Sequence, residues 1–489
     1  MERDVWKEQL YSISRNKKRR LIGLMIQREN TREELEMNQM KKASKLAVVC
    51  YSFGDLASQF VWTFVGSYLT IFYTDIVGLA PVAISAIMLG ARIWDAINDP
   101  MMGAIAERTQ SKWGRFRPYI AFGCPFLAIF GVLTFTNPFS GTSAAGVIWA
   151  AVTYVIAGML YTLVNIPYGA LAGVMTEDAE QRVKINTSRN IGMNIGMLIV
   201  NACSAPLMLA LSGKGATVAS SRGYTMTAVI YGIISIPLFL VLFFTAKEKI
   251  QPQKTAEKFS VKDAIGNLVK NKYLMLICLI MMLIMTAFMG RMAVLSYYVI
   301  YCLGSFEMIA VIMTVPTVLA IFASFFVPAA VKKFGKRNVL MGTVFAQSIG
   351  LLVVYFAPFD NITIVLAGCV IFGVFNVAMP ITLSMLSDSV DYMDLKAGVR
   401  TDGTAYATYG LATKVGNALG GSIGVVLLAS FGYVANQQQT VKAMEGINIV
   451  VNLIPAILYI LAGLCCLLWK ISDKDADEIR AKLKERNEK

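Results

Sequence analysis

The sequence contains no histidine among its 489 residues. Histidine is the most common general base and metal ligand, and the usual side-chain proton carrier near neutral pH. Without it, any proton transfer in this protein has to use carboxylates. Charged residues are also scarce, at 16% of the chain. That scarcity excludes a soluble protein with an ordinary charged surface.

Cysteine is present but forms no motif. Nearly all of the eight cysteines fall inside apolar runs and lack metal-ligand spacing, so we interpret them as small hydrophobic residues rather than disulfides or a zinc site. The sequence also shows no nucleophile–base pair. We therefore expect no enzymatic activity, no catalytic residue, no cofactor and no resident metal beyond a coupling ion.

Long hydrophobic runs are abundant, with 56% of residues hydrophobic and a mean hydropathy of +0.58. Runs of about 20 residues can cross the hydrocarbon core of a bilayer. This composition predicts an all-α polytopic membrane protein. We expect twelve transmembrane helices, at about 46–74, 81–107, 117–137, 144–173, 186–212, 224–245, 273–303, 307–331, 338–357, 362–386, 403–432 and 446–470.

The net charge of +14 is concentrated in short connectors, which favours the positive-inside rule over nucleic-acid binding. Residues 108–118 and 332–337 carry four bases each, and residues 246–272 carry seven. All three connectors follow even-numbered spans, so we expect both termini in the cytoplasm of a protein in the plasma membrane. Residues 1–45 show no signal peptide and are expected to form a cytoplasmic extension.

The connector 246–272 divides the spans into two sets of six, at 46–245 and 273–470, and leaves a cytoplasmic tail at 471–489. The two sets share local patterns. WGRFRP after the second span matches FGKRNV after the eighth, and IPYGALAGVMTED matches MPITLSMLSDS. Two six-helix repeats with a site between them are typical of a secondary transporter, whereas a receptor or a channel would not explain the repeat.

Charged side chains inside spans are costly, at about 2.5–3.5 kcal/mol on insertion scales, and usually mark function. The candidates inside the spans are Asp55, Arg92, Asp95, Asp99, Arg189, Arg291 and Lys414.

The stretch RIWDAINDP in the second span is the most informative. Arg92, Asp95 and Asp99 share one helical face, and Asn98 flanks it. These oxygens suit Na⁺ or Li⁺, and a carboxylate pair can instead hold a proton. Two acids and one arginine leave one negative charge for a monovalent cation. The alternative is a static ion-pair network between helices.

The fourth span adds Tyr161, Thr162 and Asn165. Thr162 offers a hydroxyl to the cation, while Tyr161 and Asn165 share a face suited to sugar hydroxyls. The alternative is hydrogen bonding between helices. Lys414 is expected to compete with the cation or to keep the empty site neutral, and Arg189 could instead snorkel to the membrane surface.

Acids and bases also mix at the cytoplasmic ends of the spans. They are candidates for ion pairs that close the cytoplasmic side and break during transport, and the alternative is ordinary solvated loops. The candidates are Arg115, Asp178, Arg182, Asp388, Asp391 and Arg400.

ARIWDAINDPMMG, SKWGRFRPYI, YTLVNIPYGAL, SDSVDYMDLKAGVR and TKVGNALGGSIGVVLL resemble blocks of the glycoside–pentoside–hexuronide:cation symporters, the melibiose-carrier-like branch of the major facilitator superfamily. The likeness runs from about Tyr51 to Tyr433. It implies the major facilitator fold, with its two pseudo-symmetric six-helix bundles. It implies a cation site at Asp95, Asn98, Asp99 and Thr162, with Lys414 near the cation and Arg189 near the sugar.

The sequence differs from the melibiose-type pattern at the positions expected to bind the sugar. Gln59 and Asn165 stand where the melibiose-type pattern has acids, and Gly169 stands where it has tryptophan. Acids bind sugar hydroxyls strongly, so their loss argues against an α-galactoside. The intramembrane bases, with Asp55 among the balancing acids, then outnumber the acids by one. That excess favours an anionic sugar such as a hexuronide, held by Arg189 and Arg291.

The sequence therefore predicts cation-coupled symport of a sugar, with Na⁺, Li⁺ or H⁺ as the coupling ion, by a monomer that alternates its access. Neither nucleic acid nor any partner other than the lipid bilayer is expected. Two other functions are consistent with the same fold. A lipid or lysolipid transporter would need an apolar cleft, and a non-transporting membrane sensor would need no carboxylates.

Overall fold

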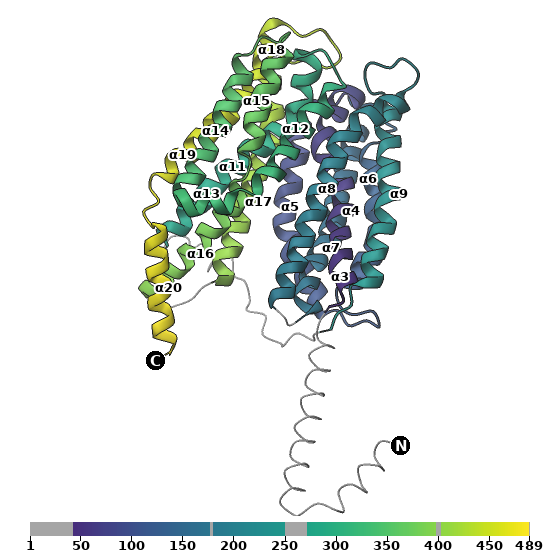
Figure 1. Cartoon of the computed structure of the whole chain (residues 1–489). Helices are drawn as coiled ribbons and strands as arrows, with labels where there is room; N and C mark the ends of the chain where they lie inside the picture. Colours follow the sequence, from purple (N-terminus) through teal and green to yellow (C-terminus); the bar gives the residue numbers. More distant parts are fainter. Residues whose placement is uncertain (1–42, 177–178, 250–270, 398–401, 489) are drawn as a thin grey trace, which may run out of the picture.

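The structure, a computed structural model, describes residues 43–176, 179–249, 271–397 and 402–488. Every regular element in these ranges is a helix. The helices form two bundles side by side, which we call the N-half (43–249) and the C-half (271–488) (Figure 1). The sequence places the boundary between the bundles at the connector 246–272, most of which lies outside the described residues, so these bounds stay a prediction.

The N-half consists of α3 (Lys45–Cys50), α4 (Ser52–Ile71), the π-helical turn η1 (Phe72–Val77), α5 (Pro81–Arg108), α6 (Arg117–Thr134), α7 (Ala144–Met175), α8 (Ala179–Ser212) and α9 (Ser221–Thr245). The C-half consists of α11 (Lys272–Tyr297), η2 (Tyr298–Cys302), α12 (Met308–Ser324), α13 (Val327–Phe334), α14 (Lys336–Phe356), α15 (Ile362–Val374), α16 (Ala378–Ala397), α17 (Asp402–Ser430), α18 (Val441–Asn448), η3 (Ile449–Leu453), α19 (Ile454–Cys466) and α20 (Asp473–Glu488).

Ten helical segments of the described chain are long and apolar enough to cross a membrane, and the pair α12 and α13 makes an eleventh if it counts as one span bent by 58°. The twelfth expected span is α5. Its 28 residues would extend about 42 Å at 1.5 Å each. It is missing from the ten because Arg92, Asp95 and Asp99 make its composition too polar.

Three spans differ in extent or shape from the approximate bounds that the sequence predicts. The first span continues through η1 to Val77, and the tenth runs to Lys396 through a break between α15 and α16. The eighth bends before Val327 instead of continuing straight. Turn residues and hydropathy mark where an apolar run stops, but they do not reveal a charged helix end that neighbouring helices keep buried.

Local sequence explains most helix ends. Ser143 and Ser220 each accept a hydrogen bond from the backbone N–H three residues ahead, at the starts of α7 and α9, which satisfies an otherwise free N–H group. Gly78 ends η1 with φ +81°, a conformation that favours glycine. Pro81 then opens α5, where its fixed φ suits the first turn.

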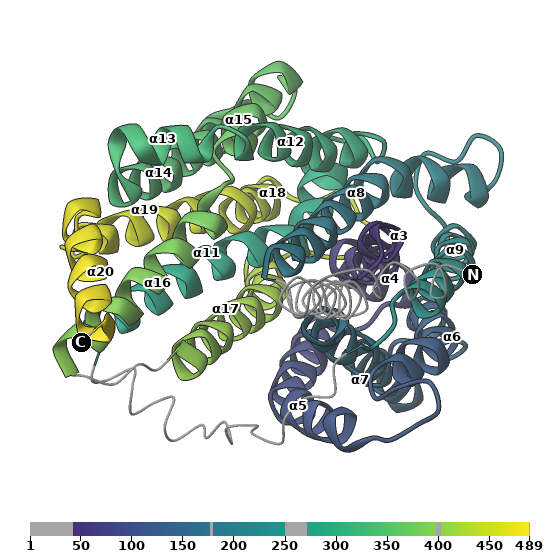
Figure 2. The same ribbon diagram turned by 60° about the horizontal axis from the view of Figure 1, so that its bottom comes forward.

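The two halves meet along α4, α5 and α8 of the N-half and α11, α12 and α17 of the C-half (Figure 2). Ser85 on α5 donates to the carbonyl of Ser422 on α17 at 2.8 Å. Asn201 on α8 donates to Thr317 on α12 at 3.2 Å. Because α5 and α17 contact each other directly, charged groups on these two helices can meet.

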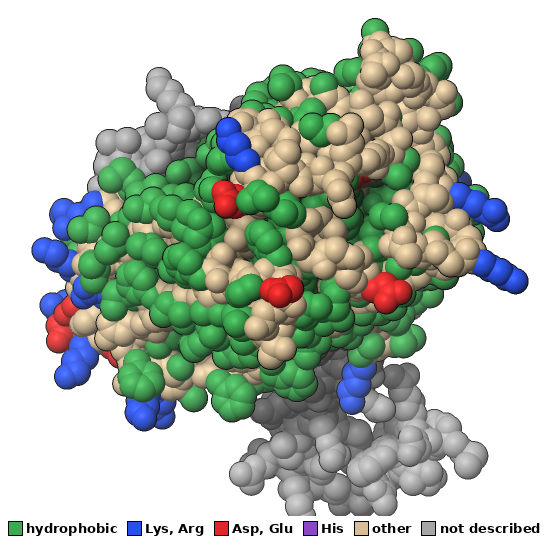
Figure 3. Space-filling view, turned by 90° about the horizontal axis from the view of Figure 1, so that it is seen from above, with side chains coloured by type: hydrophobic (Ala, Val, Ile, Leu, Met, Phe, Trp, Pro, Cys, Tyr) green, Lys and Arg blue, Asp and Glu red, His purple; other side chains and the backbone are tan. Residues whose placement is uncertain are grey.

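We call the end of the molecule that carries α20 the α20 end and the opposite one the α18 end (Figure 1). Among the described residues, polar contacts between the halves lie at the α18 end and the middle. The one nearest the α20 end joins Asp99 and Lys414. Figure 3 looks onto the α18 end, whose surface carries few charged side chains. The halves are therefore fastened at the α18 end.

Candidate functional site

Asp99 lies at the centre of the candidate site, where α5, α7 and α17 converge. Thr162 on α7 donates to one carboxylate oxygen, Oδ1, at 2.8 Å. The ammonium of Lys414 on α17 forms an ion pair with the other oxygen, Oδ2. The Lys414 side chain is 50% exposed and that of Asp99 is 14% exposed. The carboxylate is thus held by both halves while its lysine partner still reaches solvent.

Asp95 lies one helical turn away on the same face of α5. Its Oδ2 accepts from Arg92 Nη1 at 3.2 Å. Its Oδ1 faces Gly158 on α7, where a Cβ would lie 3.5 Å from that oxygen. The predicted stripe of Arg92, Asp95 and Asp99 therefore exists as one cluster facing α7 and α17.

The four charges of this cluster cancel, because Arg92 and Lys414 balance Asp95 and Asp99. The sequence alone suggested a single negative charge left for a cation. The structure adds Lys414 to that balance through its ion pair with Asp99, while its two expected roles, competing with the cation and keeping the empty site neutral, stay predictions. A monovalent cation at Asp99 would have to replace the ammonium.

Two amides near the cluster have unmet hydrogen-bonding capacity. Asn98 is buried, and its Nδ2 has no hydrogen-bond partner among the described residues. Asn417, one turn beyond Lys414 on α17, likewise has a buried Oδ1 without a partner in the described chain. Buried polar atoms are normally satisfied, so unpaired ones are candidates for a role in a bound state.

A second ion pair joins α4 and α8. Arg189 Nε donates to Asp55 Oδ2 at 2.7 Å, and its guanidinium lies 5.0 Å from the ring centroid of Tyr168. Arg189 is 33% exposed, so part of it stays available for a ligand. Gly169 leaves room for this side chain, because a Cβ there would lie 3.4 Å from Arg189 Nη1. Arg189 is therefore paired within the protein rather than extended to the membrane surface.

An aromatic pair lies beside the Arg92–Asp95 ion pair. Trp62 on α4 stacks on Tyr161 at 4.4 Å between ring centroids, and the Arg92 guanidinium lies 5.5 Å from the Trp62 ring. The tip of the Trp62 ring also approaches Gly158, beside Asp95. Trp62 is missing from the predicted site, although it follows Asp55 and Gln59 at the i, i+4, i+7 spacing of one helical face.

The remaining predicted sugar ligands are partly buried on the same helices. Gln59 Oε1 accepts from Thr63 at 2.5 Å, so its amide is held by its own helix. Asn165 lies one turn from Tyr161 on α7. α4, α7 and α8 thus present an aromatic ring, two amides and a guanidinium, which are the groups that bind hydroxyl-rich ligands.

Arg291 does not reach this region. It is 1% exposed inside the C-half, where its guanidinium lies 5.0 Å from the ring of Phe372 and 4.0 Å from Cys369 Sγ. Its Nε and Nη1 have no partner among the described residues. The expected contact with a sugar carboxylate is therefore not available in this conformation. The other three bases of that count, Arg92, Arg189 and Lys414, are each paired with an acid, so Arg291 carries the charge excess.

The predicted cytoplasmic gate lies at the α20 end, with its described members engaged inside their own halves. Arg115 and Arg182 donate to backbone carbonyls of the N-half. Asp388 pairs with Lys336 at 2.5 Å and with Arg480 of α20 at 3.1 Å, and Arg480 also approaches Asp391 at 4.0 Å. The two other members, Asp178 and Arg400, lie outside the described residues. Gate closure therefore stays a prediction.

Residues 50–473 match the family described as MFS/sugar transport protein. Among curated proteins, the chain is 32% identical over 450 residues to the uncharacterized symporter YnaJ of Bacillus subtilis (strain 168), covering 92% of this chain and 96% of that one. It is 30% identical to the isoprimeverose transporter of Lactiplantibacillus pentosus, with 89% and 91% covered. It is 28% identical to the glucuronide carrier protein homolog of Escherichia coli (strain K12), with 91% and 96% covered.

Solved structures share the fold at low identity. A D-xylose–proton symporter superposes with a TM-score of 0.63 at 16% identity, covering 87% of this chain and 97% of that one. The inward-open form of the Escherichia coli xylose transporter XylE superposes with a TM-score of 0.61 at 13% identity, with 89% and 98% covered. These likenesses establish the helical architecture.

Proposed function

From the premise that this chain belongs to the MFS/sugar transport protein family, we propose that it is a cation-coupled sugar symporter whose coupling site is Asp95 and Asp99. The observation that carries the proposal is the position of Asp99. Its carboxylate is held by Thr162 of the N-half and by Lys414 of the C-half, next to the Arg92–Asp95 pair. Charge so close to the contact between the halves can link ion binding to their motion.

The empty site is neutral, so a cation binds by displacing a charge of the same sign. When Na⁺, Li⁺ or a proton occupies Asp99, the Lys414 ammonium loses its partner. Thr162 and Asp95 can supply further oxygens for a metal ion, as can the side-chain oxygen of Asn98. Release of Lys414 removes the ion pair between the halves that lies nearest the α20 end. Cation binding thereby changes how α5 and α17 are held together.

The sugar site in this proposal is the surface formed by Trp62, Tyr161, Asn165, Gln59 and Arg189. The support is proximity, since Trp62 contacts both Tyr161 and Arg92. A cation that rearranges Arg92 and Asp95 would also shift the ring on which the sugar rests. Coupling of this kind is reciprocal, so sugar must raise the affinity for the cation by the same factor.

The basic connectors support a cytoplasmic position for the α20 end, by the positive-inside rule. In that orientation both termini are cytoplasmic and the structure represents an inward-open carrier. The predicted gate groups at this end then stay apart until the carrier turns outward. Alternating access requires the α18 end to open when the α20 end closes.

The decisive experiment is sugar counterflow in proteoliposomes, measured with Na⁺, with Li⁺ and at several pH values in the absence of both. The substrates to compare are a neutral glycoside, a pentoside and a hexuronide. We expect wild type to show counterflow that the coupling ion stimulates. Asp95→Asn and Asp99→Asn should lose at least about tenfold of that stimulation, because each removes a charged ligand. Asp360→Asn, an exposed acid outside the site, is the matched control.

The counterflow experiment also distinguishes the proposal from a static network, a lipid transporter and a sensor. Cation-independent counterflow at the wild-type rate in Asp99→Asn would reduce the cluster to a static network. Counterflow of lysolipid but of no sugar would favour a lipid transporter. No counterflow of any substrate, with ion binding unaffected by either asparagine, would favour a sensor.

A further inference from the structure

Asp75 is a partly buried carboxylate at the α18 end that the ion and sugar sites do not use. It lies in η1, the π-helical turn that ends the first span, where the sequence suggested only a connector. Among the described residues no lysine or arginine forms an ion pair with it. A carboxylate kept from water without a cation needs strong hydrogen bonds instead.

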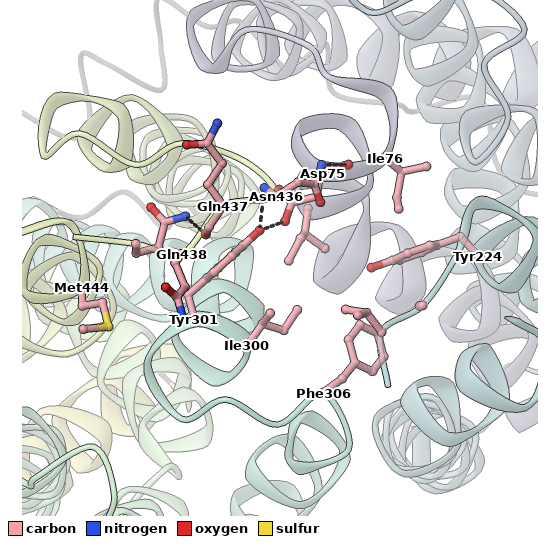
Figure 4. Close-up of a pocket in the computed structure, with 14 residues that line it drawn as sticks. Asp75, Ile76, Tyr224, Ile300, Tyr301, Phe306, Asn436, Gln437, Gln438 and Met444 are labelled. Atoms are coloured by element: carbon pink, nitrogen blue, oxygen red, sulfur yellow. Dashed lines mark hydrogen bonds between the residues drawn. The ribbon is translucent and has the colours of Figure 1, made fainter. Parts of the chain in front are cut away.

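Hydroxyl groups supply those hydrogen bonds, and two of them come from the other half, of which Figure 4 draws Tyr301. Tyr301 of η2 donates to Oδ2, while Tyr433, just after α17, donates to Oδ1. Thr74 also donates to Oδ1, at 2.5 Å. The Nδ2 group of Asn436 donates to the backbone carbonyl of Asp75. One N-half residue therefore holds three residues of the C-half.

The surrounding side chains make this contact specific. Tyr433 packs edge-on against both Tyr297 and Tyr301, with ring centroids 5.1 and 5.4 Å apart. The backbone N–H of Asn436 donates to the Tyr301 hydroxyl at 3.2 Å, from a residue with φ +58°. Asparagine tolerates this left-handed conformation better than most residues. The connector after α17 is thus shaped to bring its polar groups to Asp75.

Two further hydrogen bonds join the halves near Asp75. The hydroxyls of Thr74 and Tyr297 lie 2.8 Å apart, and Ser296 donates to the carbonyl of Ser67 at 3.2 Å. Both join α4 and η1 of the N-half to α11 of the C-half. The two halves cannot separate at the α18 end unless all of these hydrogen bonds break.

A pocket of about 600 Å³ adjoins the cluster and offers a route for water. Its lining combines apolar side chains from both halves with amides of the connector after α17, from Asn436 to Gln439. Asp75 lines the same pocket (Figure 4). When the tyrosines withdraw, water from this pocket can solvate the carboxylate, which lowers the cost of breaking the contact.

We propose that Asp75, Tyr301 and Tyr433 form a latch that holds the α18 end closed and must release before the carrier opens there. An arginine partner in place of the tyrosines would bind the carboxylate more tightly and hinder release, whereas hydroxyl donors permit a reversible contact. Asp75 is thus a positioning residue for alternating access, and this inference rests on the proposed transport function.

The test measures the separation of the halves directly. Spin labels at Thr142 of the N-half and Asp360 of the C-half, both exposed at the α18 end, report it by double electron–electron resonance, with the exposed Cys203 replaced by alanine. We expect wild type without ligands to show mainly the short distance. Asp75→Ala, and the double variant Tyr301→Phe/Tyr433→Phe, should raise the ratio of long to short distances about tenfold.

Tyr298→Phe is the matched control. Its hydroxyl belongs to the same turn as Tyr301 but has no partner among the described residues, so its loss should leave the distances unchanged. A wild-type distribution in the double variant would overturn the latch, provided its thermal unfolding matches that of Tyr298→Phe. If Asp75→Ala does not fold, the phenylalanine double variant decides the question, because it retains the packing.

A kinetic readout separates the latch from a merely structural role. A larger outward-open fraction should lower the apparent KM for sugar offered at the α18 side, since apparent affinity scales with the competent fraction. An unchanged apparent KM alongside unchanged distances would contradict the proposal. The distances require neither sugar nor cation, so a failure of counterflow in wild type would count against the proposed function and not against the latch.

Discussion

In the proposed mechanism coupling depends on Lys414 and Asp99, because their ion pair is the only one between the halves in the described part of the chain. Like charges compete for a site, so an ammonium on Asp99 and a bound cation exclude each other. The pairing of Lys414 with Asp99 comes from opposite halves of the sequence, 315 positions apart.

Replacing Lys414 tests that competition. In Lys414→Gln we expect about tenfold tighter Na⁺ or Li⁺ binding, equivalent to ~1.4 kcal/mol, because the cation no longer displaces a positive charge. Isothermal titration calorimetry of the purified protein measures this. Lys442→Gln, an exposed lysine at the start of α18, should bind as wild type does. Unchanged or weaker cation binding in Lys414→Gln would exclude a competing role for the ammonium.

Trp62 is the aromatic residue that connects the ion cluster to the proposed sugar surface. Trp62→Ala removes the ring that stacks on Tyr161, so we expect sugar binding to weaken by up to about tenfold, in line with the ~0.5–1.5 kcal/mol of an aromatic pair. Trp62→Phe should recover most of the loss. Sugar-dependent calorimetry checks both variants, with Trp113→Ala, an exposed loop residue, as control. Weakening of equal size in the control would remove Trp62 from the site.

At the scale of elements, α5 shows how one helix serves both as a structural span and as a site. Its face toward α7 and α17 carries the charged cluster, while Ile93, Ile97, Met101 and Ile105 are exposed at a spacing of four residues on another face. A stripe of that kind suits lipid. The charged cluster can therefore stay inside the protein although α5 lies at the edge of the N-half.

The element α20 lies against α16 at the α20 end of the C-half. Ser472 caps it by accepting from the backbone N–H of Asp475 at 3.2 Å. Its own N–H and hydroxyl donate to the Asp475 carboxylate, which lowers the pKa of that exposed acid. Arg480 and Arg486 then bind Asp388 and Asp394 at 3.1 and 2.6 Å. Helix α20 thus forms ion pairs with an acid that the sequence assigned to the cytoplasmic gate and with another close to it in the sequence.

Removing these contacts should release α20 without unfolding the bundle. Arginines almost half exposed contribute about 1 kcal/mol or less each, because water screens them. The double variant Arg480→Ala/Arg486→Ala should therefore be cleaved within α20 several-fold faster by trypsin, while its unfolding temperature stays close to that of wild type. Lys474→Ala removes a cleavage site on the same helix without an ion pair in the described chain and serves as control. Equal cleavage rates would mean that other contacts hold α20.

At the scale of the whole molecule, the two bundles are fastened at one end, and the candidate site lies where their contacts stop. The family match and the helical fold confirm the prediction of a major facilitator transporter rather than an enzyme. They also confirm the resemblance to glycoside–cation symporters, at about 30% identity to curated relatives. The particular sugar, the coupling ion, the topology and the monomeric state stay predictions.

The sequence by itself determined the class of this protein. Apolar runs of fixed length, basic connectors and a repeated pattern follow from the physics of the bilayer, which acts on each segment separately. The sequence also predicted the stripe of Arg92, Asp95 and Asp99, because the helical repeat fixes which residues share a face. The same repeat places Trp62 on the face of Asp55 and Gln59, but the sequence analysis missed it. An aromatic side chain in an apolar span costs no insertion free energy, so nothing distinguishes it from its neighbours.

Only the tertiary structure decided which charges meet. Asp99 with Lys414, Asp55 with Arg189, and Asp75 with Tyr301 and Tyr433 are each separated by more than a hundred positions in the chain. It also placed Arg291 inside the C-half, away from the proposed sugar surface, and the anionic sugar stays a prediction. Periodicity assigns a side chain to a face of its own helix. The helix that covers that face, and so the partner of a buried charge, depends on how the two bundles pack.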